Sequence, residues 1–109
     1  IDFQMVQSLL ADMAIKTEAS RVMVNNCMRL MDKGDLVRGE GAIVKTFVTD
    51  SMQEVTSNAV QVFGGYGFSK DYPVEKLMRD SKVFQIFEGT NQIQRMTIAK
   101  NLDAEYRQG

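Results

Sequence analysis

The feature of this sequence that most constrains its fold is a stretch from Phe3 to Lys33 that contains neither proline nor glycine. Apolar side chains recur along it with the 3.6-residue period of an α-helix. They are Val6, Leu10, Met13, Val24, Met28 and Met31. A helix of this extent is roughly 45 Å long at about 1.5 Å per residue. One small neighbour cannot cover it.

The next segment predicts a second long helix. Lys33, Gly34 and Asp35 supply a basic last turn, a C′ glycine and a turn residue, so the first helix is expected to end there. The helical period returns from about Gly39 to Phe63. Its apolar positions are Val44, Val48, Val55, Ala59 and Val62. We expect this helix to pack back on the first.

Two shorter helices follow in the prediction. Segment 64–69 is rich in glycine and is expected to form an irregular loop. Pro73 suits the first turn of a third helix that runs to about Val83, and the short apolar run up to Gly89 predicts a turn or a frayed helix end. Thr90 is a good N-cap for a last helix to about Tyr106. No alternating strand pattern occurs, so the predicted fold is an all-α, antiparallel four-helix bundle.

The composition excludes several classes of function. With 13 Lys and Arg against 14 Asp and Glu, the chain has no basic excess for nucleic acid. The absence of histidine removes the commonest zinc ligand and the commonest general base, and we predict no metal site. Apolar runs fall far short of the roughly 20 residues that span a bilayer, so no membrane span is expected.

Length and apolar content predict a single domain. A chain of 109 residues with 44% hydrophobic content can bury a modest core without disulfides. The single cysteine, Cys27, is expected to be a small buried side chain. The chain starts at Ile1 with no signal or transit pattern, which predicts an intracellular protein. A start without Met inside a helical pattern also suggests a fragment or a processed chain.

Two segments can carry chemistry, and each has an ordinary explanation as well. Glycines at the end of a helix can simply stop it, or they can let a ligand approach the backbone closely. No strand precedes them, so they are not a Rossmann fingerprint. Glu88 lies just before a predicted helix start, where an acidic residue is favourable in itself. It can equally be a general base at the wall of an apolar pocket.

Three motifs together resemble the C-terminal signature of one enzyme family. They are Gln61–Gly67 (QVFGGYG), Tyr72–Asp80 (YPVEKLMRD) and Ile86–Arg95 (IFEGTNQIQR). In this order and spacing they are similar to the acyl-CoA dehydrogenases, most closely the medium-chain type. The resemblance extends upstream through Leu10–Ala14 and so covers nearly the whole chain.

This resemblance implies a reaction on a fatty acyl-CoA. Glu88 occupies the place of the family's base, which removes the α-proton while the β-hydrogen passes as hydride to N5 of FAD, giving the trans-2-enoyl-CoA. The backbone N–H of Glu88 is implied to help hold the thioester carbonyl. Phe87 and Gly89 are the implied substrate contacts, and Phe87 stands where many members have Tyr. Electrons would then pass to an electron-transferring flavoprotein.

The resemblance also implies how FAD is bound. Thr90 and Gln92 would lie near the FAD of the same subunit, at a helix N-terminus suited to a phosphate. Three residues near the end of the second helix would reach the adenine end of a neighbouring subunit's FAD, and two at the start of the first helix match a further contact. The first group is Gln61, Gly64 and Gly65, and the second is Phe3 and Gln4. Sharing of this kind implies a homodimer or homotetramer.

In the same way, residues 1–109 correspond to the C-terminal domain of a larger flavoenzyme whose N-terminal helical domain and middle β-domain are not in this sequence. We therefore expect little turnover from these residues alone, in a protein of the bacterial cytoplasm or the mitochondrial matrix. Two alternatives stay open. One is a flavin oxidase or monooxygenase of the same architecture, and the other is a non-catalytic helical bundle that pairs with a partner.

Overall fold

The computed structural model describes residues 3–36 and 39–108, and within these ranges every regular element is helical. The elements are α1 (Gln4–Asp32), α2 (Glu40–Phe63), η1 (Gly64–Phe68), α3 (Val74–Lys82), η2 (Val83–Gln85) and α4 (Asn91–Gln108), where η denotes a 3-10 helix. The prediction of an all-α fold with four helices is confirmed. The predicted bounds of the first two helices agree with the structure to within one residue at each end.

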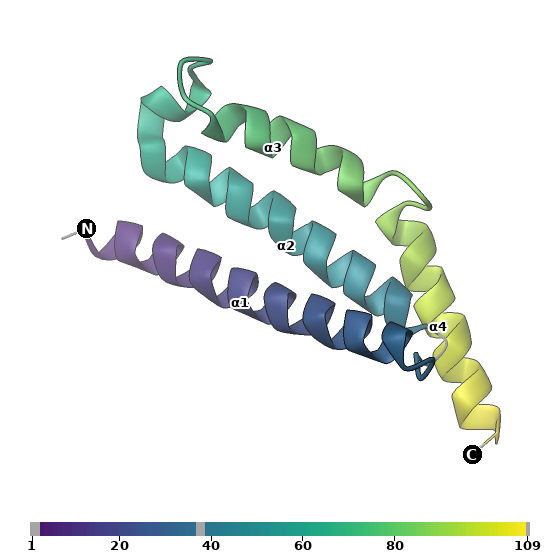
Figure 1. Cartoon of the computed structure of the whole chain (residues 1–109). Helices are drawn as coiled ribbons and strands as arrows, with labels where there is room; N and C mark the ends of the chain where they lie inside the picture. Colours follow the sequence, from purple (N-terminus) through teal and green to yellow (C-terminus); the bar gives the residue numbers. More distant parts are fainter. Residues whose placement is uncertain (1–2, 37–38, 109) are drawn as a thin grey trace.

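Helix α2 is the centre of the arrangement (Figure 1). Helix α1 runs antiparallel to it on one side and α3 antiparallel to it on the other, while α4 starts near the N-terminal half of α2 and extends away at an angle. The molecule is elongated, with extents of 52 × 26 × 26 Å. Its radius of gyration is 16.8 Å, whereas a compact domain of this length has about 13 Å.

The end of α1 shows why the chain turns where the sequence predicts. Gly34 has a φ of +72°, a left-handed conformation that glycine adopts without strain. Its N–H donates to the carbonyl of Met31 at 3.1 Å, and the N–H of Asp35 donates to the carbonyl of Leu30 at 2.8 Å. This pair of hydrogen bonds is the Schellman motif, which satisfies the last carbonyls of a helix.

The glycine-rich segment is more regular than predicted. Residues Gly64–Phe68 form a 3-10 helix rather than an irregular loop. The reason is a close approach of backbone to backbone, because Gly67 is buried against the last turns of α2. A Cβ atom at this position would lie 2.4 Å from the carbonyl oxygen of Val60. The absence of a side chain at position 67 therefore allows η1 to fold tightly onto α2.

The interior is thinner and more polar than the apolar content predicts. Among the described residues, Val74 is the one buried large apolar side chain, at 8% exposure. The other buried side chains are those of Thr46, Thr49, Ser51, Ser81 and Asn91. The valine stripe of α2 is half-buried and faces α1, while small polar side chains fill the joints of α2 with α3 and α4. Cys27 is half-buried, not buried as expected.

Much apolar surface is therefore exposed. The accessible surface is 8024 Å², compared with about 6,100 Å² for a typical monomer of 12.3 kDa. Large exposed apolar side chains occur on every α-helix, for example Ile15 at 65%, Leu77 at 55% and Met96 at 56%. Nevertheless, no helix in the described part of the chain combines the length and the apolar character needed to cross a membrane.

The close approach at Gly67 gives a testable prediction. We expect Gly67→Ala to lower the free energy of unfolding by about 1–3 kcal/mol, because the new methyl group must displace backbone atoms. Gly41→Ala is the matched control, since nothing lies within 4 Å of its Cβ position. The control should raise stability by up to about 1 kcal/mol through helix propensity. Urea unfolding of both variants measures the difference, and equal stabilities would contradict the packing argument.

Candidate functional site

The turn that carries Glu88 links η2 to α4 and has an unusual backbone. Glu88 has a φ of +52° and is the one non-glycine residue with positive φ in the described chain, and Gly89 follows at +90°. A left-handed conformation at a residue with a Cβ atom costs about 1–3 kcal/mol and persists only where the surroundings enforce it. The Glu88 side chain itself is exposed.

Both carbonyl groups of this pair are held by side chains. Gln94 Nε2 donates to the Glu88 carbonyl at 3.0 Å, and Lys45 Nζ donates to the Gly89 carbonyl at 2.9 Å. One donor comes from the first turn of α4 and the other from α2, so the turn is fastened to two elements. Position 89 also suits glycine sterically, because a Cβ atom there would lie 3.0 Å from Gln94 Nε2.

Thr90 caps α4, as the sequence predicts. Its Oγ1 accepts a hydrogen bond from the N–H of Ile93 at 3.2 Å, and its carbonyl accepts one from the N–H of Gln94 at 2.9 Å. This is the geometry of a threonine N-cap. The N-terminus of a helix presents backbone N–H groups and the positive end of its dipole, which suit a phosphate. Gln92 is exposed at the same end of the helix.

Aromatic packing fixes the residue before Glu88. The ring of Phe87 meets that of Phe84 edge to face, with centroids 5.3 Å apart. Lys45 Nζ lies 6.0 Å from the centroid of Phe87, at the outer limit of a cation–π contact. Phe87 is nevertheless 43% exposed. The turn therefore exposes an apolar ring at the residue before Glu88.

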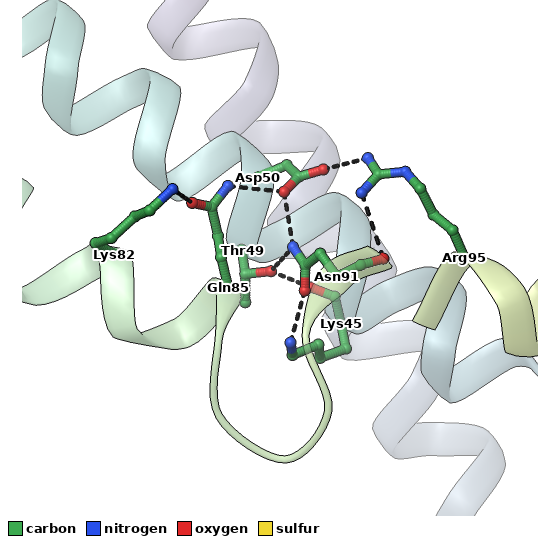
Figure 2. A network of polar contacts seen from close by, with 7 residues as sticks. All are labelled: Lys45, Thr49, Asp50, Lys82, Gln85, Asn91 and Arg95. Atoms are coloured by element: carbon green, nitrogen blue, oxygen red, sulfur yellow. Dashed lines mark hydrogen bonds and ion pairs between the residues drawn. The ribbon is translucent and has the colours of Figure 1, made fainter. Parts of the chain in front are cut away.

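At the base of the turn, on the side of α2, lies a network of polar contacts centred on Asn91, the first residue of α4 (Figure 2). Its side chain is 2% exposed. Its Nδ2 donates to Thr49 Oγ1 at 2.8 Å and to Asp50 Oδ1 at 2.7 Å, and its Oδ1 accepts from Lys45 Nζ at 2.6 Å. A buried amide needs partners for both of its ends, and α2 provides all three.

Asp50 accepts hydrogen bonds from both sides of the turn. Gln85 Nε2 donates to Oδ1 at 2.8 Å, and the guanidinium of Arg95 donates to Oδ2 and pairs with it in charge. Burial by itself raises the pKa of Asp50. The hydrogen bonds from Arg95, Asn91 and Gln85, with the charge of Arg95, outweigh that effect and lower the pKa below its usual value.

The other candidate FAD contacts lie at the opposite end of α2. Gln61, Gly64 and Gly65 are exposed where α2 ends, and Phe3 and Gln4 are exposed at the same end of the molecule (Figure 1). No atom lies within 4 Å of the Cβ positions of the two glycines, so a ligand can approach their backbone. At about 1.5 Å per residue, this end is about 20 Å from Asp50. The open glycine edge and the helix N-terminus both fit parts of a dinucleotide.

Sequence reasoning missed Lys45, Asp50 and Asn91 as parts of the site. A signal for the first two was present, because both charges interrupt a mostly apolar stretch of α2, and Lys and Asp are rarely buried unless they are paired. Asn91 gave no such signal, since an amide beside a helix cap is ordinary. Only the fold shows that it faces α2.

Comparisons with known proteins agree on one family. Residues 1–102 match the family model described as acyl-CoA dehydrogenase, C-terminal domain. The probable acyl-CoA dehydrogenase FadE25 of Mycobacterium tuberculosis is 50% identical over 101 residues, which is 92% of this chain and 26% of that protein. The chain spans about a quarter of the length of the curated relatives it matches.

Solved structures give the same answer. Butyryl-CoA dehydrogenase from Megasphaera elsdenii superposes with a TM-score of 0.88 at 42% identity, over 93% of this chain and 26% of that chain. A structure described as the FAD complex of PigA superposes with a TM-score of 0.87 at 27% identity, over 93% of this chain and 26% of that chain.

The contacts of Lys45 give a second testable prediction. Lys45→Met keeps much of the side-chain volume but removes the donor to the Gly89 carbonyl and to the buried Oδ1 of Asn91. We expect a loss of about 1–3 kcal/mol in unfolding free energy. Lys82→Met is the control, because its ammonium bonds Gln85 in an exposed position, and it should change stability by less than about 0.5 kcal/mol. Equal losses in urea unfolding would contradict this role.

The lowered pKa of Asp50 gives a third prediction. The stability that ionised Asp50 contributes is present above its usual pKa of 3.8 and is lost as the pH falls through that value toward the lower folded pKa. Asp50→Asn cannot titrate. The protein should therefore be more stable than this variant at neutral pH, and the gap should close on acidification. Urea midpoints across the acid range measure it, and a gap that does not depend on pH would contradict the assignment.

Proposed function

Because this chain belongs to the acyl-CoA dehydrogenase family, we propose that it is the C-terminal domain of an FAD-dependent enzyme that oxidises fatty acyl-CoA thioesters to trans-2-enoyl-CoA. The observation that carries the proposal is the turn around Glu88. A carboxylate in the family's motif stands in a strained turn whose two carbonyl groups are each held by a side chain. Such an arrangement suits a base that must keep one position.

We propose Glu88 as the base that removes the α-proton. The carboxylate takes the proton from Cα, and the carbon–hydrogen electron pair forms the Cα–Cβ double bond. A bound FAD would supply the acceptor for the β-hydrogen, which leaves as hydride. The backbone N–H of Glu88 is proposed to donate to the thioester carbonyl, which stabilises the negative charge that develops on that oxygen.

The residues around Glu88 would bind the substrate and the cofactor. Phe87 exposes part of its ring next to Glu88 in the sequence, and Phe87 and Gly89 are the proposed substrate contacts. Thr90 and Gln92 stand at the N-terminus of α4, which suits the negative charge of the FAD of the same subunit. The resemblance to PigA, a structure described with FAD, supports a flavin in this protein as well.

The exposed surfaces support a larger, oligomeric protein. We propose an N-terminal helical domain and a middle β-domain that precede this chain, in a homodimer or homotetramer. The excess accessible surface is of the order of that buried in stable protein interfaces. Residues Gln61, Gly64 and Gly65 lie at the far end of α2 from Thr90, as expected if they contact a neighbouring subunit's FAD. Phe3 and Gln4 stand at the start of α1, and the N-terminus lies at that same end of the molecule (Figure 1).

An electron-transferring flavoprotein is the proposed acceptor of the electrons. A structure whose description names the electron-transferring flavoprotein of Acidaminococcus fermentans superposes on this chain at 44% identity with a TM-score of 0.88, over 93% of this chain and 27% of that chain. The bacterial origin of relatives such as FadE25 favours the bacterial cytoplasm over the mitochondrial matrix.

The proposal predicts the behaviour of Glu88→Gln in the full-length protein. We expect FAD to stay bound but its reduction by acyl-CoA to stop, because the amide cannot take the α-proton. Anaerobic titration with short-, medium- and long-chain acyl-CoAs, followed by flavin absorbance, measures this. Glu105→Gln is the matched control, since Glu105 is exposed far along α4. The flavin of this variant should be reduced by acyl-CoA as in wild type. Normal reduction in Glu88→Gln would remove Glu88 from its role.

The same titration tests the function as a whole. A wild-type flavin that stays oxidised with every thioester would contradict the dehydrogenase proposal. Oxygen uptake with peroxide formation in the absence of an electron acceptor would instead indicate a flavin oxidase.

A further inference from the structure

Nothing in the turn itself explains why Glu88 keeps its position. Its backbone conformation is unfavourable and its side chain is exposed. The turn must therefore be held from outside. Gln85 and Asn91 flank the turn. Contacts of these two residues can hold it, because fixing both ends of a short turn restricts the backbone between them.

The residues at both ends of the turn donate hydrogen bonds to the same atom. Asp50 Oδ1 accepts a hydrogen bond from Gln85 Nε2 at 2.8 Å and another from Asn91 Nδ2 at 2.7 Å (Figure 2). Gln85 is the last residue of η2 and Asn91 the first of α4. A single carboxylate oxygen on α2 thus closes the base of the turn. The other oxygen of Asp50 holds Arg95, one turn further along α4.

Asp50 also sets which way the Asn91 amide faces. A carboxylate can only accept hydrogen bonds, so it selects the NH₂ end of the amide. The carbonyl end is then turned toward Lys45 Nζ at 2.6 Å. If the amide turned over, its NH₂ group would face the ammonium, donor against donor. The orientation imposed by Asp50 therefore leaves Lys45 correctly placed to hold the Gly89 carbonyl at 2.9 Å.

We propose that Asp50 is a positioning residue for catalysis, which sets the place of Glu88 by tying both ends of its turn and by orienting Asn91. This inference rests on the proposed role of Glu88 as the base. Asp50 acts only through the turn, and no contact between it and the substrate is needed.

The test compares variants of the full-length protein with FAD bound. Asp50→Ala removes both acceptor oxygens, and we expect the rate of anaerobic flavin reduction by acyl-CoA to fall about 10- to 100-fold, as a misplaced reacting group does. FAD content and the acyl-CoA concentration for half-maximal reduction should not change. Asp50→Asn keeps one acceptor oxygen for Gln85 and Asn91, so its rate should lie between those of wild type and Asp50→Ala.

Glu54→Ala is the matched control. Glu54 lies one turn further along α2 and pairs with Lys16 of α1, away from the turn. Its loss removes the same charge from the same helix, and the rate should stay at the wild-type value. A wild-type rate in Asp50→Ala would overturn the proposal, and so would an equal fall in FAD content and rate, which indicates a general loss of structure.

A double-mutant cycle separates positioning from an independent effect. Glu88→Asp shortens the base and slows the reaction on its own. If Asp50 acts by placing Glu88, Asp50→Asn should have a smaller effect in the Glu88→Asp protein than in wild type. Additive effects would overturn the proposal.

Amide hydrogen exchange tests the hold of Asp50 on the turn independently of the proposed function. Exchange at residues 86–91 should be faster in Asp50→Asn than in Glu54→Ala or wild type, whether or not a substrate is turned over. If wild-type flavin is not reduced by any acyl-CoA, the proposed function fails, and faster exchange still supports the hold of Asp50 on the turn. Unchanged exchange at these amides would overturn the positioning proposal while leaving the dehydrogenase function in place.

Discussion

The buried amide of Asn91 is the contact on which the geometry of this chain depends. With 2% of its surface exposed, its side chain can exchange little with water, so the protein must satisfy both of its ends. Three side chains of α2 do so, and this requirement decides where α4 begins and at what angle it leaves. An apolar residue at the same place could pack against α2 in several ways, whereas the amide makes its hydrogen bonds in only one arrangement. The hydrogen bonds of Asn91 therefore also fix the position of the strained turn that precedes α4.

Helical periodicity was enough to predict most of the fold. The two long stretches with helical apolar periodicity became α1 and α2, and Gly34 and Thr90 ended or started helices through the hydrogen bonds that such residues usually make. The segment from Gly64 was predicted less well, because its 3-10 form depends on the contact between Gly67 and Val60. Periodicity says nothing of such an approach between two stretches of backbone.

The candidate site could be predicted only in part. The turn of Glu88 stood out through its motif, but what holds the turn did not. Lys45 and Asp50 are separated from Gly89 and Asn91 by 44 and 41 positions respectively, and no local pattern relates residues so far apart. The apolar content was also misleading about the interior. It predicted a core within the chain, yet the buried side chains are mostly small and polar, and the large apolar side chains are half-buried between helices or exposed.

This distribution of polar and apolar side chains has a consequence for the stability of the chain. A domain with one buried large apolar side chain in its described part gains little free energy from its own interior. In the proposed full-length protein, two kinds of contact would cover the outer faces. Burial against the preceding domains of the same polypeptide would not depend on protein concentration, whereas burial against a neighbouring subunit would obey mass action. The subunit share of the stability would then be lost on dilution, and the melting temperature of the proposed oligomer would rise with protein concentration.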